Sequence, residues 1–205
     1  MPRPAGWRPG LEICRYWWPQ TDPQWRPDAA LVDFLRAGPP PVYVGFGSTM
    51  TSAKQSEHIS QLVRSALRRA GVRGIVQAGW AGIDVGDETT LTVTEVPHRW
   101  LFPHVAAVVH HCGAGTTAAG LRAGVPTVAV PGLGDQPFWA RRLRDLGLSA
   151  DTVPQRTLTV ERLAAAIRTA VTDPGIKIRA RRISDLLAAE DGAAHVVSSV
   201  NRLLG

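Results

Sequence analysis

Residues 105–124 read VAAVVHHCGAGTTAAGLRAG, and this stretch decides the fold class. Val105–His110 is almost wholly apolar, which is typical of a strand that is buried on both faces. Gly113–Ala123 then predicts a helix, and Gly124 is the residue type that most often follows a helix end. A buried strand that turns into a helix through glycines is a building unit of parallel α/β sheets.

The same alternation of short apolar strands and helices runs through the chain from Val42 onward. It predicts a doubly wound, Rossmann-like α/β domain over residues 42–205, with a parallel sheet and helices on both faces. The other expected strands are Val42–Phe46, Gly74–Gln77, Leu91–Val93 and Pro126–Val130, and the other expected helices are Ser52–Ala70, Gln136–Leu146, Val160–Val171, Pro174–Glu190 and Gly192–Leu204.

Residues 1–41 form a different kind of segment, a lead-in or linker rich in proline and tryptophan. Seven of the 16 prolines of the chain lie before residue 40. We expect a short strand at Leu11–Tyr16 and a helix at Asp28–Ala37, with Asp28 as its cap. Exposed apolar surface is expected around Trp17 and Trp18, and such surface usually marks an interaction site.

Composition excludes several classes of protein. A chain of 205 residues can bury a full core without disulfides, and no apolar run is long enough for a membrane helix. The net charge of +6 comes from arginines that fall on predicted helices, so we interpret them as solvated faces and expect no nucleic-acid partner. Cys14 and Cys112 have no metal-ligand spacing, and we expect free thiols in a cytoplasmic protein.

The turn after the strand Val105–His110 contains residues of the types that bind phosphate groups. In doubly wound sheets ligands bind beyond the carboxyl ends of the strands. Backbone N–H groups at a helix start are unpaired and lie at the positive end of the helix dipole. The alternative is that the glycines only allow close packing of the helix on the sheet. His110 should point to the opposite face and be structural. The candidate phosphate-binding residues are His111, Gly113, Gly115, Thr116 and Thr117.

Three further loops follow predicted strands. The first contains Gly47 and Ser48, which suit either an anion or a plain tight turn. The second, Pro131–Pro137, contains Asp135 and Gln136, a pair suited to sugar hydroxyls, although Asp135 may equally serve as a helix cap. The third, Val96–Pro103, offers Val96–His98 to a planar base, whereas Trp100 and Phe102 are expected in the core.

An oxidoreductase interpretation also fits part of the pattern. Gly113, Gly115 and Ala118 match the dinucleotide fingerprint Gly-x-Gly-x-x-Ala, and Asp135 lies 20 residues beyond Gly115. The fingerprint stands in the middle of the chain, however, instead of in the first strand–helix unit.

Taken together, these motifs resemble the C-terminal, donor-binding half of GT-B fold glycosyltransferases of the sterol-glucosyltransferase-like and antibiotic-aglycone type. The resemblance covers nearly the whole chain, through PRPAGW (2–7), YWWP (16–19), VYVGFGSTM (42–50) and the block from Val96 to Leu143. It implies that His111, Gly113, Gly115, Thr116 and Thr117 bind the nucleotide-sugar diphosphate and that Gly47 and Ser48 lie near it. It also implies that Asp135 and Gln136 bind the donor sugar and that Val96 and His98 lie at the base. Ala119 stands where plant members carry a ribose-binding glutamate.

The implied reaction is inverting transfer of a hexose from a UDP- or TDP-sugar to a lipid, sterol or natural-product hydroxyl, with no metal and no cofactor. The N-terminal acceptor domain, which carries the catalytic base, is expected to be absent, so no catalytic residue is assigned and the chain alone should be inactive. Its expected partners are an acceptor-domain chain or a second copy. The alternatives are a non-catalytic sugar-nucleotide-binding module, one subunit of a split enzyme, and a nicotinamide-dependent oxidoreductase.

Overall fold

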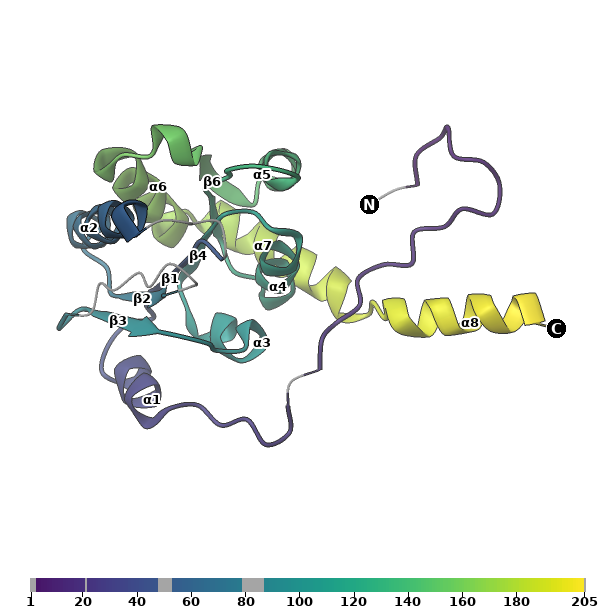
Figure 1. Cartoon of the computed structure of the whole chain (residues 1–205), viewed down its shortest axis with the longest axis horizontal. Coiled ribbons are helices and arrows are strands. Elements are labelled where there is room, and N and C mark those ends of the chain that lie inside the picture. Colours follow the sequence, from purple (N-terminus) through teal and green to yellow (C-terminus); the bar gives the residue numbers. More distant parts are fainter. Residues whose placement is uncertain (1–2, 21, 48–52, 79–86, 205) are drawn as a thin grey trace.

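Figure 1 shows the computed structural model of the chain, which describes residues 3–20, 22–47, 53–78 and 87–204. A layered α/β body holds most of these residues, and an N-terminal segment and the C-terminal helix extend from it. Among the described residues, no helix is both long and apolar enough to cross a membrane.

The body is built on a six-stranded sheet in which all neighbouring strands are parallel and the order is β3-β2-β1-β4-β5-β6. The order reverses between β1 and β4, where Val44 pairs with Val109 and Gly45 with His110. In doubly wound sheets ligands bind at the carboxyl edge of the sheet, where the strand order reverses. The strands are β1 (Val42–Gly45), β2 (Gly74–Gln77), β3 (Thr90–Val93), β4 (Ala107–His110), β5 (Thr127–Ala129) and β6 (Ser149–Thr152).

Helices cover both faces of the sheet, because successive strand side chains point to opposite sides. On one face Val42, Val44 and Val109 pack with α2 (Ala53–Ala70) and α6 (Val160–Thr172). The other face is covered by α1 (Ala29–Arg36), α3 (His98–Leu101), α4 (Ala114–Ala123), α5 (Gln136–Asp145) and α7 (Pro174–Ala188), together with the 3-10 helix η1 (Phe102–His104). On this face Tyr43 and Val108 pack with α1, α3, η1 and α4, and Ala129 packs with α5 and α7. The doubly wound fold class is confirmed.

The expected helix boundaries follow from the capping chemistry. Asp28 caps α1, because its carboxylate accepts from the amide of Ala30 at 2.7 Å. Asp173 caps α7 in the same way, with Pro174 in the first turn. Gly124 ends α4 in the left-handed conformation at φ 68°, which favours glycine.

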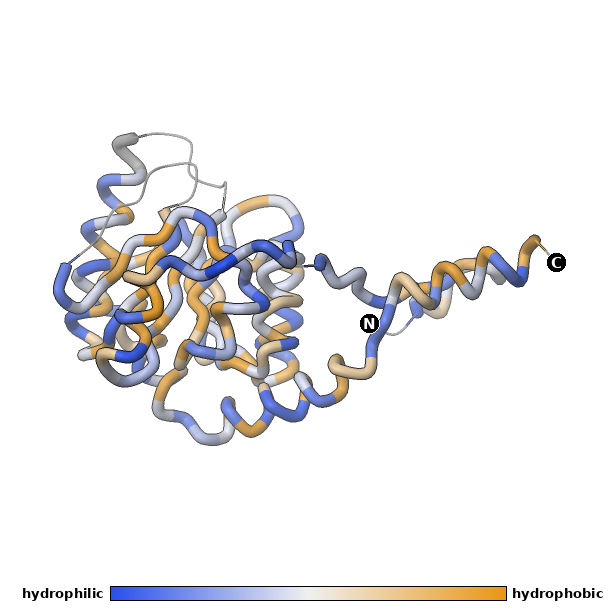
Figure 2. The backbone as a smooth tube through the Cα atoms, turned by 90° about the horizontal axis from the view of Figure 1, so that it is seen from below, coloured by the Kyte–Doolittle hydropathy of each residue, from blue (hydrophilic) through white to orange (hydrophobic). Residues whose placement is uncertain are grey.

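Residues 3–18 of the lead-in and helix α8 (Gly192–Leu204) lie beside each other, outside the body (Figure 1). The Trp18 indole nitrogen donates to the Glu190 carbonyl at 3.0 Å, and His195 Nε2 lies 3.0 Å from Glu12 Oε2. The lead-in passes very close to the start of α8 at Gly192, where a Cβ would lie 2.5 Å from the Cys14 carbonyl oxygen. Figure 2 shows α8 standing clear of the body with apolar and polar residues interspersed.

Three local expectations were wrong. Leu11–Tyr16 forms no strand, because it has no neighbouring strand and Arg15 takes a φ of 64° that breaks an extended segment. The short helix α3 was expected to be a loop. Strand β6 was not expected, since its sequence Ser-Ala-Asp-Thr carries no apolar run.

Candidate functional site

The N-terminus of α4 lies beside the point where the strand order reverses, and it presents unpaired donors. Gly113 is the N-cap residue and has no side chain to occupy the first turn. The amides of Ala114, Gly115 and Thr116 make no hydrogen bond within the described part of the chain. The amide of Thr117 corrects one expectation, because it donates to the Gly113 carbonyl at 2.9 Å and is not free. The Thr117 side chain is buried, with no partner for its hydroxyl.

His111 lies between Gly47 and Gly113, which belong to the two glycine-containing loops identified in the sequence. A Cβ at Gly47 would lie 2.8 Å from the ring atom Cε1, and a Cβ at Gly113 would lie 2.5 Å from Nε2. Gly47 also has a φ of 59°, so both positions require glycine. The Nδ1 atom of His111 is buried without a hydrogen-bond partner. Ser48, the other candidate of the first loop, lies outside the described residues.

The charge state of His111 depends on burial and on Asp135. Burial lowers the pKa of the imidazole below its ordinary value, while the Gly45 carbonyl and the Asp135 carboxylate act in the opposite direction. The ring is therefore mostly neutral near pH 7. Asp135 follows β5, which pairs with β4, so its loop and the turn that carries His111 lie at the same edge of the sheet.

Asp135 and Gln136 play different parts in that loop. Asp135 is exposed and accepts from the Trp139 indole N–H at 2.8 Å. Asp135 is the N-cap residue of α5, as the helix-cap interpretation expected, but its side chain makes no capping hydrogen bond. Gln136 is buried, and its Oε1 accepts from the Gly132 amide at 2.8 Å. Gln136 thus holds the loop in shape, whereas the Asp135 carboxylate is presented to solvent.

His110 and Cys112 shape the turn from inside the protein. His110 is 1% exposed, and its Nδ1 accepts from the Cys112 amide at 3.1 Å, so the ring carries its proton on Nε2. Burial, with a smaller contribution from His111, lowers the pKa of His110 to about 3. Burial also raises the pKa of the Cys112 thiol to about 12, and Cys112 takes a φ of 66°. The expected structural role of His110 is confirmed.

A cleft of about 970 Å³ continues from the start of α4 toward α3. Val96, Pro97 and His98 line one side of it, and Gly115 and Thr116 line another. The residues expected at the base and two of those expected at the diphosphate thus line one cleft, whereas His111, Gly113 and Asp135 do not line it.

His98 is held in this cleft by contacts with Phe102 and Tyr43. Its ring stacks on Phe102 at 4.5 Å, and its Nε2 lies 3.1 Å from the Tyr43 hydroxyl. That hydroxyl donates to Gln77 Oε1, so it accepts from His98, whose proton then sits on Nε2. Burial, with His111 nearby, lowers the pKa of His98 to about 4. Phe102 is fully buried, as expected, and Trp100 is half-buried against its neighbours.

The third wall of the cleft comes from residues that were not assigned to the donor site from the sequence, and Trp18, which was expected to be exposed, is half-buried there. Tyr16, Trp18 and Trp25 of the lead-in line it, as does Arg122 of α4. The Arg122 guanidinium lies over the Trp18 ring at 4.1 Å. Arg122 stands seven residues after Gly115 and so faces the same way on the helix, which was the one available signal. The lead-in had no comparable signal, since its place depends on the tertiary fold.

These features define the chain as the donor-binding, C-terminal type of domain found in GT-B fold glycosyltransferases. More particularly, residues 83–203 match the family described as "Erythromycin biosynthesis protein CIII-like, C-terminal domain", and the chain belongs to this family. Family membership removes the oxidoreductase interpretation, because Gly113–Ala118 is accounted for as part of a glycosyltransferase domain. The Gly-x-Gly-x-x-Ala pattern follows β4 here, and not the first strand.

Characterised relatives are glycosyltransferases of two kinds. The chain is 46% identical over 193 residues to the O-mycaminosyltylonolide 6-deoxyallosyltransferase of Streptomyces fradiae, covering 94% of this chain and 44% of the relative. It is 37% identical over 202 residues to a sterol 3-beta-glucosyltransferase of Arabidopsis thaliana, covering 97% of this chain and 31% of the relative. The chain thus spans less than half the length of these relatives.

Solved structures agree with the fold. The glycosyltransferase of kitacinnamycin superposes with a TM-score of 0.71 at 24% identity, over 93% of this chain and 48% of that one. The glycosyltransferase VinC, solved in complex with DTDP, superposes with a TM-score of 0.65 at 26% identity, over 82% and 43% of the two chains. Among the residues that the structure describes, no group of three His, Cys, Asp or Glu side chains could hold a metal ion.

Proposed function

We propose that this chain is the donor-binding half of an inverting glycosyltransferase, which uses a UDP- or TDP-hexose and a lipid, sterol or natural-product hydroxyl. The observation that carries the proposal is the convergence at the start of α4. Three unpaired amides, of Ala114, Gly115 and Thr116, lie there beside the half-buried ring of His111, whose Nδ1 atom is buried without a partner. Such a site suits a diphosphate that is bound without a metal ion.

The chemistry of this half is stabilisation of the leaving group. When an acceptor hydroxyl attacks the anomeric carbon, the bond to the diphosphate breaks and negative charge grows on the departing phosphate. The start of α4 offers roughly half a positive charge from the helix dipole together with its N–H groups. Removing one preorganised donor of this kind typically costs about 3–4 kcal/mol of transition-state stabilisation. His111 adds a ring N–H, which becomes charge-assisted if the imidazole gains a proton.

The donor sugar is assigned to Asp135 and the base to the loop Val96–His98. The Asp135 carboxylate is exposed at the carboxyl edge of the sheet and can accept from sugar hydroxyls while it still accepts from Trp139. Val96, Pro97 and His98 line the far end of the cleft. Gln136 supports Asp135 through its bond to Gly132, and its amide nitrogen is the remaining donor for the sugar.

The acceptor site is proposed to come from a second body, either an acceptor domain or another copy. Leu133 is 85% exposed and stands two residues before Asp135, and Trp17 is 59% exposed on the lead-in. Helix α8 exposes Val197, Val200, Leu203 and Leu204. Exposed apolar residues grouped in this way are typical of interaction surfaces. The catalytic base would reach the acceptor hydroxyl from that second body.

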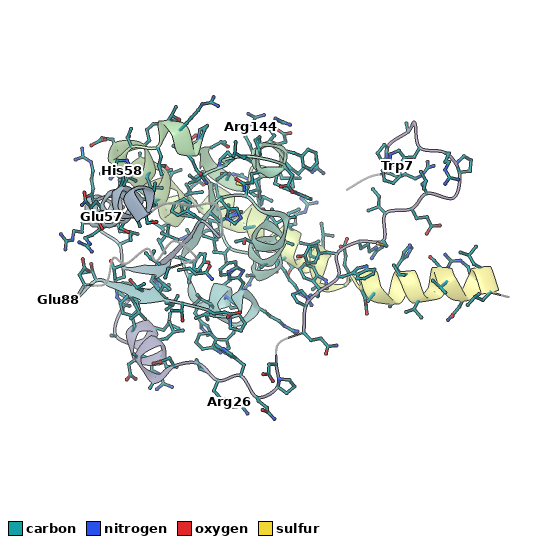
Figure 3. All side chains as sticks on the ribbon, viewed as in Figure 1. Trp7, Arg26, Glu57, His58, Glu88 and Arg144 are labelled. Carbon is teal, nitrogen blue, oxygen red and sulfur yellow. The ribbon has the colours of Figure 1, made fainter. Side chains whose placement is uncertain are left out.

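Titration calorimetry with UDP, TDP, GDP and NAD tests the donor assignment. We expect binding of UDP or TDP and none of NAD. His111→Ala should weaken the binding by about 1.5–3 kcal/mol, since one hydrogen bond to a charged group is lost. The matched control is His58→Ala, because His58 is exposed at the outer edge of α2 (Figure 3). Unchanged affinity in a folded His111→Ala protein would remove His111 from the site.

A transfer assay separates an enzyme half from a binding module. The chain should transfer sugar only after an acceptor domain of a relative is added. Tight binding of UDP or TDP with no transfer in any such mixture would support the non-catalytic module instead.

A further inference from the structure

The side of α4 that lines the cleft has few polar groups beyond Gly115 and Thr116, which are proposed to bind the diphosphate. Gly115, Thr116, Ala119, Arg122 and Ala123 line the cleft along this helix. From Thr116 to Arg122 the helix rises about 9 Å, which is the span from a diphosphate to the nucleoside attached to it. A nucleoside lying along α4 would therefore meet two alanine methyl groups and a single charged donor, the guanidinium of Arg122.

Arg122 is held in place from several sides. Its guanidinium carbon lies 4.1 Å from the centre of the Trp18 ring, and Trp18 is anchored by its indole N–H on the Glu190 carbonyl. The backbone carbonyl of Arg122 accepts from the Ser184 hydroxyl at 2.6 Å. Stacking on an aromatic face fixes the plane of a guanidinium, yet leaves its N–H groups free to donate within that plane.

One of those nitrogens lacks a partner. The Nη1 atom of Arg122 is buried and makes no hydrogen bond to the protein. A buried, charged donor that is left unpaired is costly, and proteins generally satisfy such groups with a ligand, a water molecule or a neighbouring acceptor. The residue lines the cleft and is fixed before any ligand arrives, which is the usual state of a recognition residue.

We propose that Arg122, clamped by Trp18, is a nucleoside-recognition residue that donates from Nη1 to a neutral oxygen of the nucleoside. The oxygen is either a pyrimidine carbonyl or a ribose hydroxyl, since both accept a hydrogen bond and lie beyond the diphosphate. This inference rests on the proposed donor-binding function and extends it to the segment Tyr16–Trp18, which becomes part of the donor site.

A purely structural role makes a different prediction. If Arg122 only fastened the lead-in to the body, its loss would loosen Trp18 without distinguishing a nucleotide from a bare diphosphate. The comparison of UDP with inorganic pyrophosphate, which has no nucleoside, therefore separates the two roles.

The experiment is calorimetric titration of the full chain and its Arg122→Ala variant with UDP, TDP and pyrophosphate. We expect Arg122→Ala to bind UDP roughly 10- to 100-fold more weakly and to bind pyrophosphate within about twofold of the unmodified chain. TDP lacks the 2′-hydroxyl, so its affinity should fall by the same factor only if Arg122 donates to another oxygen of the nucleoside. Arg144→Ala is the control for loss of one arginine charge, because Arg144 points outward from α5 (Figure 3) and is 63% exposed. Arg122→Lys, which keeps the charge and the stem, replaces Arg122→Ala if the latter fails to fold.

The outcomes are distinct. Equal affinities for UDP in the variant and the unmodified chain, or equal losses for UDP and pyrophosphate, would overturn the role of Arg122. If the unmodified chain binds none of the three ligands, the donor-binding function itself is refuted. A variant that discriminates as expected supports the proposal, and 2′-deoxy-UDP then identifies the oxygen: the loss disappears with this ligand if the 2′-hydroxyl is the acceptor and persists if another oxygen is.

Discussion

Acidification should unfold this protein through His98 and His110. Both rings are buried in the folded state, which holds their pKa values at about 4 and about 3, against an ordinary value of 6.5. The unfolded chain therefore binds two protons as the pH falls through 6.5, while the folded chain does not. Stability is full above pH 6.5 and is lost progressively as the pH falls toward 4.

The magnitude follows from the difference in proton binding. Each pH unit below 6.5 costs about 1.4 kcal/mol for a histidine that stays neutral in the fold. Between about pH 8 and about pH 5 each of the two residues removes about 2 kcal/mol, or about 4 kcal/mol together. His111, whose pKa is also lowered by burial, acts in the same direction. A typical domain has a free energy of unfolding of about 5–15 kcal/mol, so the loss from the two histidines is roughly one third of it.

Urea denaturation followed by tryptophan fluorescence measures the effect at each pH. The variant His110→Asn removes one titrating group and keeps an oxygen near the position of Nδ1 for the Cys112 amide. Whatever stability it loses at pH 8, its further loss on going to about pH 5 should be smaller by about 2 kcal/mol. An identical loss in both proteins would show that His110 is not a buried neutral group.

Two further predictions concern the ligand. Asp135→Ala should weaken binding of UDP-glucose while leaving UDP nearly unchanged in calorimetry, because the exposed carboxylate is proposed to bind the sugar and not the nucleotide; equal losses for both ligands would make Asp135 a structural residue. Binding of UDP-glucose should also take up a proton, because a diphosphate bound next to His111 would raise a pKa that burial has lowered, so affinity rises as the pH falls. Heats measured in buffers of different ionisation enthalpy count that proton, and buffer-independent heats, or an uptake that survives in His111→Ala, would contradict the assignment.

The sheet was predictable where its strands are buried on both faces. β1, β2 and β4 were located within one or two residues because their sequences are continuously apolar. β6 lies at the sheet edge with mostly half-buried side chains, so its polar sequence gives no such pattern. The four residues of α3 are too few for helical periodicity to show.

The candidate site was predictable to the extent that it depends on strand ends. His111, Gly113 and Gly47 meet because the loops after β1 and β4 are neighbours at the reversal of strand order, and the rule for doubly wound sheets anticipates this. Individual hydrogen bonds were not predictable, as the paired amide of Thr117 shows. Arg122 and Trp18 meet across 104 positions of sequence, and no local pattern encodes that contact.

The anchoring of Trp18 on Glu190 has a consequence for the order in which the protein matures. Trp18 and Glu190 are 172 positions apart, and Gly192 packs closely against the backbone of Cys14 and Tyr16 in the same two segments. During synthesis the lead-in emerges first, yet its resting place exists only when the end of α7 has left the ribosome. The sheet and the start of α4, the proposed phosphate-binding turn, can fold before the end of α7 is synthesised. The aromatic side of the cleft can form only afterwards. The proposed nucleoside wall is therefore completed only at the end of translation, and an interrupted chain would retain the proposed phosphate-binding turn without that wall.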